Sequence, residues 1–274
     1  MRILIGFLSL SLALFSYSCT EESPVESGSD MVVVSAFLYA GQPVNDVRLT
    51  SVLPLGSEDE SAPPISNAEI VLLRGGEQFT LLPDRSREGY YYYLGGDLSV
   101  NSGDDFALQI RYQQQLITGE TNVPSRPASV GISGTTLEIP PLDFQDFRGK
   151  GLDLNDYSLL ISWENLDASL YYVVLENLEV DPEPVFGDLP FVPTRRFISE
   201  PAPTSEYLVS MMTASFFGSY RGIVYRVNEE YADLYETREQ DSRNLNEPLS
   251  NINNGLGVFS AFASDTVYFQ VVPQ

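Results

Sequence analysis

The 274-residue sequence contains no histidine and only one cysteine, Cys19. Without histidine, a chain has no Ser-His-Asp or Cys-His catalytic arrangement, no imidazole general base and no His-ligated metal site. A single cysteine cannot form a disulfide within the chain. No apolar run reaches the about 20 residues that a membrane-spanning helix needs. These absences remove the commonest catalytic machinery and a helical membrane span.

Basic residues are also scarce. Lys and Arg number 15 against 38 Asp and Glu, which gives a formal net charge of -23. Because binding to a phosphate backbone needs clustered Lys and Arg, nucleic acid is not an expected partner. Hydrophobic residues make up 43% of the chain, enough for a packed core, and the length suits one large domain or two ordinary ones.

The first residues have the layout of a secretory signal peptide. Arg2 precedes a short apolar segment, residues 3–15, and Cys19 follows shortly after it. This arrangement resembles a bacterial lipobox, which predicts that residues 1–18 are removed and that Cys19 becomes the acylated first residue. Several acyl chains on one cysteine would anchor the protein stably to a membrane. Ordinary secretion with a free thiol is the alternative.

The residues on either side of Cys19 suggest a particular envelope. Ser16 and Tyr17 stand where an aliphatic and a small residue are usual, and such loose lipoboxes resemble those of Bacteroidota lipoproteins. Residues 19–30 form a polar tether that begins with Glu21 and Glu22. Acidic residues at these positions resemble the signal for display on the outer face of the outer membrane. A generic solvated linker would have the same composition.

The first half of the body, residues 31–142, is predicted to be an immunoglobulin-like β-sandwich. Short segments rich in β-branched and aromatic residues are separated by Gly and Pro turns, without helical periodicity. The predicted strands are residues 31–39, 47–53, 68–74, 78–82, 90–94 and 106–112. Four prolines between Pro124 and Pro141 indicate a connection between domains.

The second half, residues 143–274, is predicted to be a β-rich domain with one short helix. Its predicted strands are residues 157–163, 170–175, 207–212, 219–227 and 267–272. The helix is predicted near residues 229–242. Asn228 caps it, acids occupy its first turn, and Tyr231, Leu234 and Tyr235 share one face. Glu239 and Arg243 are predicted to form an ion pair on its last turn.

Five blocks of sequence, in this order, resemble the domain-of-unknown-function 4249 (DUF4249) family of Bacteroidota lipoproteins. The blocks are residues 32–50, 65–73, 122–130, 225–236 (YRVNEEYADLYE) and 247–265 (EPLSNINNGLGVFSAFASD). The resemblance implies an envelope lipoprotein, often encoded near outer-membrane TonB-dependent transporters, without an established activity. It transfers no catalytic residue to this chain, and only Cys19 carries over as a functional position.

Four consecutive tyrosines, Tyr90 to Tyr93, are the first candidate for a binding surface. On a strand, Tyr90 and Tyr92 point to one face while Tyr91 and Tyr93 point to the other. One pair is expected in the core, and we predict that Tyr91 and Tyr93 form a face on which a sugar or peptide stacks. Ordinary cross-strand packing is the alternative, since aromatics are normal strand residues.

Two further segments have a functional and a structural interpretation. The Asn- and Gly-rich residues 251–259 either grip a partner or form a turn that locks the helix onto the last strands, and turn chemistry favours the second. Asp97, Asn101, Asp104 and Asp105 offer oxygen ligands for calcium, but their spacing departs from the EF-hand loop. Aspartate and asparagine are equally typical of turns.

Taken together, the sequence predicts a non-enzymatic lipoprotein on the outward face of the outer membrane. It would act as an accessory or binding subunit of a TonB-dependent transporter or another outer-membrane assembly. No metal and no cofactor are expected. The alternative is a free-standing surface module for glycan binding or adhesion. A carboxylate-dependent hydrolase ranks third, because none of the many acids lies in a recognisable catalytic motif.

Mass spectrometry of the mature N-terminal peptide tests the predicted anchor. We expect the chain to begin at Cys19 and to carry the mass of acyl chains on that residue. An unmodified thiol at Cys19, in protein released freely into the medium, would contradict the lipoprotein prediction.

Overall fold

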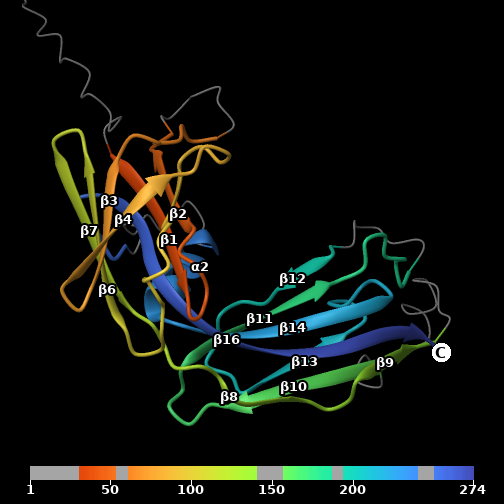
Figure 1. Cartoon of the computed structure of the whole chain (residues 1–274). Coiled ribbons are helices and arrows are strands. Elements are labelled where there is room, and N and C mark those ends of the chain that lie inside the picture. The colour runs from red at the N-terminus through yellow and green to blue at the C-terminus, as the bar shows by residue number, and fades with distance from the viewer. Residues whose placement is uncertain (1–30, 54–60, 141–156, 187–193, 240–249) are drawn as a thin grey trace, which may run out of the picture.

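The computed structural model describes residues 31–53, 61–140, 157–186, 194–239 and 250–274. Its strands build two lobes that meet at an angle (Figure 1). The prediction of a mainly β chain with an immunoglobulin-like sandwich is confirmed. Residues 1–18, Cys19 and the tether lie outside the described residues, so the structure does not bear on the predicted anchor.

The N-terminal lobe is a sandwich of two sheets. Its strands are β1 (Val32–Tyr39), β2 (Asp46–Ser51), β3 (Glu69–Arg74), β4 (Glu77–Pro83), β5 (Tyr90–Tyr92), β6 (Asp105–Tyr112), β7 (Gln115–Asn122), β15 (Ile252–Asn253) and the first part of β16 (Leu256–Pro273). One sheet has the order β16-β1-β2-β5 and the other β4-β3-β6-β7-β15. β4 belongs to both, because it pairs with β3 along most of its length and with β5 at its end.

Side-chain alternation explains why β1 forms and which face it buries. Val32, Val34, Ala36 and Leu38 are at most 1% exposed, whereas the residues between them are partly exposed. The buried set faces the inward side chains of the opposite sheet, such as Leu72 of β3. A strand of this composition gains its stability from the apolar area that it removes from water.

The C-terminal lobe is a second sandwich with its own core. Its strands are β8 (Ala128–Ile132), β9 (Thr136–Ile139), β10 (Ser158–Glu164), β11 (Leu170–Asn177), β12 (Arg196–Ile198), β13 (Glu206–Ser210), β14 (Gly218–Val227) and the second part of β16. A sheet of order β12-β11-β14-β16, with β9 paired to β16, faces the sheet β13-β10-β8. Trp163, the only tryptophan, lies between them and is 5% exposed.

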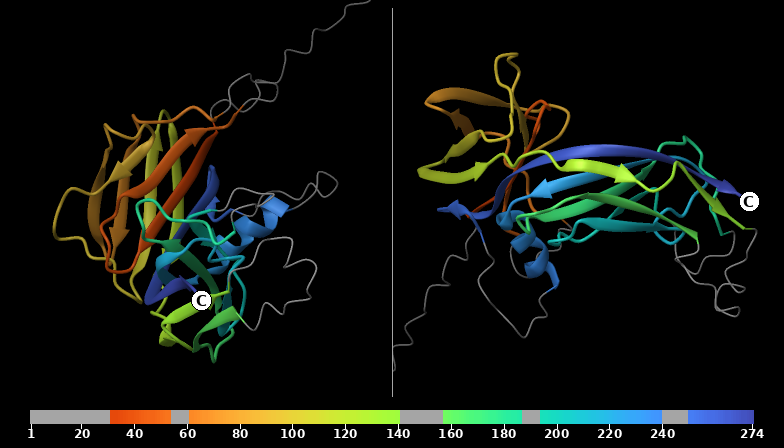
Figure 2. Two further views of the ribbon diagram at one scale, coloured as in Figure 1. Left: turned by 90° about the vertical axis from the view of Figure 1, so that its right-hand side faces the viewer. Right: turned by 90° about the horizontal axis from the view of Figure 1, so that it is seen from below.

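β16 is shared by both lobes. Residues 256–262 pair in parallel with β1, and residues 263–271 pair antiparallel with β14. The right-hand view of Figure 2 shows this strand running without a break from one lobe into the other. The lobes are therefore linked by a continuous hydrogen-bonded sheet, not by a flexible connection alone.

An aromatic cluster, hereafter the aromatic junction, fills the inner angle where the lobes meet. Tyr231 meets Phe262 edge-on, with ring centroids 4.7 Å apart, and Tyr172 stacks on Tyr225 at 4.9 Å. Such contacts stabilise beyond the area that they bury. The members of the aromatic junction are Phe37, Tyr39, Tyr172, Tyr225, Tyr231 and Phe262. They come from both lobes and from the helix, so the junction fixes all three to one another.

The helix α2 (Glu229–Glu239) lies in the inner angle and starts where the sequence predicts. Glu230 accepts hydrogen bonds from Thr121 (2.7 Å) and Ser260 (3.2 Å), and the Asn228 amide donates to the Asn122 carbonyl (2.8 Å). These bonds tie the helix start to β7 and β16. The predicted helix end and the Glu239–Arg243 pair extend beyond the described residues. No helix among those residues has the length and apolar character that a bilayer span requires.

The boundary predicted at residue 142 does not match the observed lobes. Ile252, Phe259 and Ala261 belong to the core of the N-terminal lobe, although they lie near the end of the chain. Conversely, Leu137 and Ile139, which precede the predicted boundary, belong to the core of the C-terminal lobe. The chain thus leaves the first lobe, builds the second and returns, an arrangement that a single cut in the sequence cannot represent.

One segment predicted as a connection contains strands, and one predicted strand is longer than expected. The proline-rich residues 124–141 contain β8 and β9, which complete the two sheets of the C-terminal lobe. The final strand was predicted only over residues 267–272, but β16 starts at Leu256. Prolines at the ends of β8 and β9 do not interrupt their pairing, because proline is tolerated next to edge strands.

Gly257 permits the close approach of β16 to β1, and substituting alanine there tests this role. Its φ is +106°, and a Cβ at this position would overlap the backbone of Val34. We therefore expect Gly257→Ala to lower the free energy of unfolding by about 3 kcal/mol or more. Urea denaturation followed by circular dichroism measures the loss.

Gly76→Ala is the matched control, because Gly76 has φ +91° but no atom within 4 Å of the added Cβ. Gly76→Ala should lower the free energy of unfolding by only about 1–2 kcal/mol, which is the cost of placing a residue with a Cβ in the left-handed region. Equal losses for the two variants would show that the approach to β1 contributes nothing.

Candidate binding groove

The structure places the tyrosines of β5 on the alternating faces that the sequence predicts, but the pair facing the core is the opposite one. Tyr91 is fully buried. Its hydroxyl donates to the Ile65 carbonyl and accepts from the Ala68 amide, both at 3.0 Å. A buried ring with a satisfied hydroxyl offers no face to a ligand, so the prediction that Tyr91 contacts one is wrong.

Tyr93, the second predicted contact residue, lies just after β5 and is partly buried. Its hydroxyl donates to Asp97 at 2.6 Å, and this bond raises the pKa of the Tyr93 hydroxyl. Its ring meets Phe79 edge-on at 5.5 Å. Tyr93 therefore packs against the edge of the core and does not form a platform together with Tyr91.

Tyr90 and Tyr92 face outward instead, and arginines accompany them. Arg48 of β2 lies directly across from Tyr90, with its guanidinium carbon 5.7 Å from the ring centroid. Arg87 lies closer, at 4.5 Å. Both distances fall within the range of cation–π attraction.

The turn between β4 and β5 holds Arg87 in place. Arg87 donates to the Asp84 carboxylate (2.8 Å) and to the Asn45 carbonyl (2.9 Å). Asp84 also accepts from the backbone amide (2.9 Å) and the hydroxyl (2.6 Å) of Ser86. Hydrogen bonds from Ser86 and Arg87 hold the pKa of Asp84 well below its usual value. The carboxylate is therefore ionised and already neutralised by its neighbours.

An open groove of about 710 Å³ runs beside this turn. Leu82, Pro83 and Tyr92 supply its apolar walls. Its polar groups come from Asn45, Asp84, Arg85, Ser86 and Arg87. Arg85 is exposed and makes no hydrogen bond or ion pair with any residue that the structure describes. The groove thus presents a free cation beside an aromatic face, which is a binding arrangement.

The residues considered for calcium make hydrogen bonds within the loops and turns around them. Asp97 holds the Tyr93 hydroxyl, Asp104 accepts from the Asn101 backbone amide (2.9 Å), and Asp105 accepts from Asn122 (2.8 Å). The described residues contain no group of three or more Asp, Glu, Cys or His that could hold a metal ion. These side chains act in turns, which is the structural alternative.

The Asn- and Gly-rich residues 251–259 also have the structural role that turn chemistry favours. The Asn251 side chain donates to the carbonyls of Glu120 (3.0 Å) and Phe259 (2.6 Å) and accepts from the Phe259 amide (2.9 Å). β15 within this segment pairs with β7. The segment closes the N-terminal lobe between β7 and β16.

Sequence reasoning missed Arg48, Arg85 and Arg87 as companions of the tyrosines. Arg85 and Arg87 lie in the turn before β5, where the alternation of a strand does not apply, so their positions in the sequence carry no signal for the face that they accompany. Which tyrosine pair faces the core depends on the pairing of β5 with β2 and β4, and this pairing is not visible in one sequence.

The fold and groove define a two-lobed β-sandwich protein with an open groove lined by polar and aromatic side chains. The model of the family described as Domain of unknown function (DUF4249) matches residues 20–267, and the chain belongs to this family. No curated protein matched the sequence.

Two solved structures were matched at low similarity. One contains domains A168-A170 from titin, with 11% identity, a TM-score of 0.22, and 73% of this chain and 61% of that chain covered. The other contains the FN1-FN3 domains of chicken CNTN1, with 7% identity, a TM-score of 0.25, and 86% and 66% covered. This chain therefore spans less than two thirds of either structure.

Replacing single tyrosines by phenylalanine tests the assignment of β5 faces. We expect Tyr91→Phe to lower the free energy of unfolding by about 1–3 kcal/mol, because it leaves the Ile65 carbonyl and the Ala68 amide without their partner. Tyr92→Phe, on the outward face, should change it by less than about 0.5 kcal/mol. Chemical denaturation of both variants provides the comparison, and a costlier Tyr92→Phe would reverse the assignment.

Proposed function

We propose that this protein is a non-enzymatic binding protein on the outward face of the outer membrane, anchored through acyl chains on Cys19. It would serve as an accessory or binding subunit of a TonB-dependent transporter or another outer-membrane assembly. Membership of the DUF4249 family and the signal-peptide layout that ends at Cys19 support the proposal. The absence of histidine supports a role in binding over one in catalysis.

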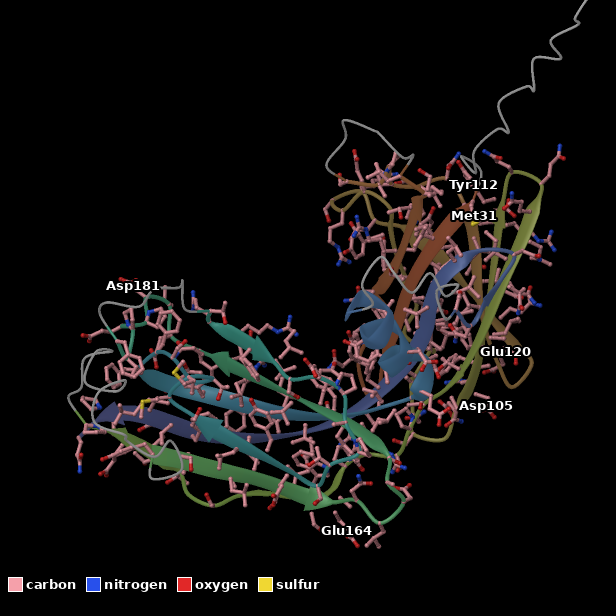
Figure 3. All side chains as sticks on the ribbon, turned by 180° about the vertical axis from the view of Figure 1, so that it is seen from behind. Met31, Asp105, Tyr112, Glu120, Glu164 and Asp181 are labelled. Atoms are coloured by element: carbon pink, nitrogen blue, oxygen red, sulfur yellow. The ribbon has the colours of Figure 1, made fainter. Side chains whose placement is uncertain are left out.

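The position of Met31 is the observation that carries the proposal. Figure 3 shows Met31 at the end of the N-terminal lobe away from the junction, while Asp181 marks the far end of the C-terminal lobe. Eleven residues separate Cys19 from Met31. They reach at most about 40 Å when fully extended. An anchor at Cys19 would therefore keep this end of the first lobe within about 40 Å of the membrane surface.

The rigidity of the body supports a docking role. β16 pairs with strands of both lobes, and the aromatic junction packs their facing sides together. Binding a partner costs less when the contacting surfaces are already ordered relative to each other. A body of this kind suits a subunit that contacts an assembly through surfaces of both lobes.

A free-standing glycan-binding or adhesion module is the second candidate. The groove beside Tyr92 favours it, because the groove joins an outward aromatic ring to the unpaired guanidinium of Arg85. A sugar is recognised by such a combination of ring stacking and polar contacts.

Co-purification from gently solubilised outer membranes tests the proposal. An affinity tag at the C-terminus should recover the protein together with a TonB-dependent transporter or another outer-membrane protein. The matched control is Cys19→Ala, which should lose both membrane attachment and the co-purified protein, because anchoring depends on the acyl chains. Recovery of the wild-type protein only as a lone monomer would contradict the accessory role and favour the second candidate.

A further inference from the structure

The free cation of the groove is the first indication of its ligand. Arg87 is held by Asp84, Asn45 and the ring of Tyr90, whereas Arg85 has no partner among the described residues. The N–H donors of a guanidinium lie in one plane, so the group can donate two parallel hydrogen bonds to the two oxygens of a carboxylate. Arg85 is therefore placed to take a carboxylate from outside the chain.

The charge of the rest of the protein makes this position unusual. The chain carries a formal net charge of -23, so most of its surface repels anions. In the groove, Arg87 already compensates the charge of Asp84 through their ion pair, which leaves the charge of Arg85 uncompensated. The charge of Arg85 attracts an anionic ligand here. At an ionic strength near 0.1 M, salt screens this attraction at distances beyond about 10 Å.

The walls and size of the groove indicate a saccharide. Its volume of about 710 Å³ lies within the range of small-molecule sites. The outward ring of Tyr92, with Leu82 and Pro83 beside it, offers an apolar face to the C–H groups of a sugar ring. The exposed Asn45 amide adds donors and an acceptor for hydroxyl groups.

The same groove is less suited to binding a peptide than a saccharide. A peptide that joins a sheet needs an unpaired strand edge. Here Leu82 pairs with Tyr92 and Pro83 pairs with Tyr91, so β4 and β5 are bonded to each other where they border the groove. Recognition must therefore come from side chains, which favours a compact ring over an extended chain.

We propose that this groove binds an acidic saccharide, whose carboxylate pairs with Arg85 while a sugar ring stacks on Tyr92. This inference deepens the second candidate function, glycan binding at the same groove, and rests on it, whereas it is independent of the accessory role. It assigns to the groove one class of ligand, oligosaccharides that contain uronic acids.

Isothermal titration calorimetry on the full-length protein in detergent tests the assignment. The probes are trimers of galacturonate, glucuronate and mannuronate, each compared with the neutral trimer of the corresponding hexose, and a Glu-rich pentapeptide. We expect at least one acidic trimer to bind, its neutral counterpart to bind at least about tenfold more weakly, and the affinity to fall with added salt.

Substitutions then locate the site. Arg85→Gln should weaken binding of the acidic trimer by at least about tenfold and leave the neutral trimer unchanged, and Tyr92→Ala should weaken both. Arg111→Gln is the matched control, because Arg111 is an exposed arginine on β6 of the opposite sheet. It should leave binding unchanged.

Three results would overturn the inference: no binding of any acidic trimer, equal affinity for acidic and neutral trimers, or tighter binding of the pentapeptide than of every saccharide. The accessory role is tested separately. Arg85→Gln should still co-purify with the outer-membrane partner, and Cys19→Ala should still bind the trimer, so that failure of one proposal leaves the other standing.

Discussion

The pairing of β16 with strands of both lobes is the constraint on which the rest of the structure depends. The strand enters the first lobe in parallel beside β1, where only glycine at position 257 permits the close approach to Val34. It then continues as a central strand of the second lobe beside β14. Parallel pairing of this kind requires a long connection between the two strands, and here residues 40–255, which hold the other strands of the first lobe and most of the second lobe, form that connection.

The shared strand also determines what lies at the surface. β16 and β1 form one sheet, and the outer face of that sheet borders the inner angle between the lobes. The aromatic junction and α2 cover this face. At the other end of the same sheet, β5 pairs with β2, and this register turns Tyr91 into the core and Tyr92 toward the groove. The candidate site is thus positioned by the sheet that holds the two lobes together.

Local features were predictable from the sequence, whereas long-range pairing was not. The alternation of Val32, Val34, Ala36 and Leu38 predicts β1, and the acids after Asn228 predict the start of α2, because both signals lie within a few residues. The domain boundary was wrong because residues 252–261 return to a core built some 200 positions earlier. The predicted alternation of the tyrosines was correct. The pairing of β5 with β2 and β4 decides which face is buried, so the prediction that Tyr91 and Tyr93 face a ligand was wrong for the buried Tyr91.

The most direct test is whether a destabilising substitution in the N-terminal lobe also lowers the stability of the C-terminal lobe. Trp163, which is buried in the C-terminal lobe, reports the unfolding of that lobe through its fluorescence. Leu72 is fully buried in the N-terminal core, and truncating it to alanine removes about 2–5 kcal/mol of stability. If β16 makes the lobes one cooperative unit, Leu72→Ala lowers the urea midpoint of Trp163 fluorescence as much as that of the circular dichroism signal. An unchanged Trp163 midpoint in this variant would show that the lobes unfold independently and would contradict the account.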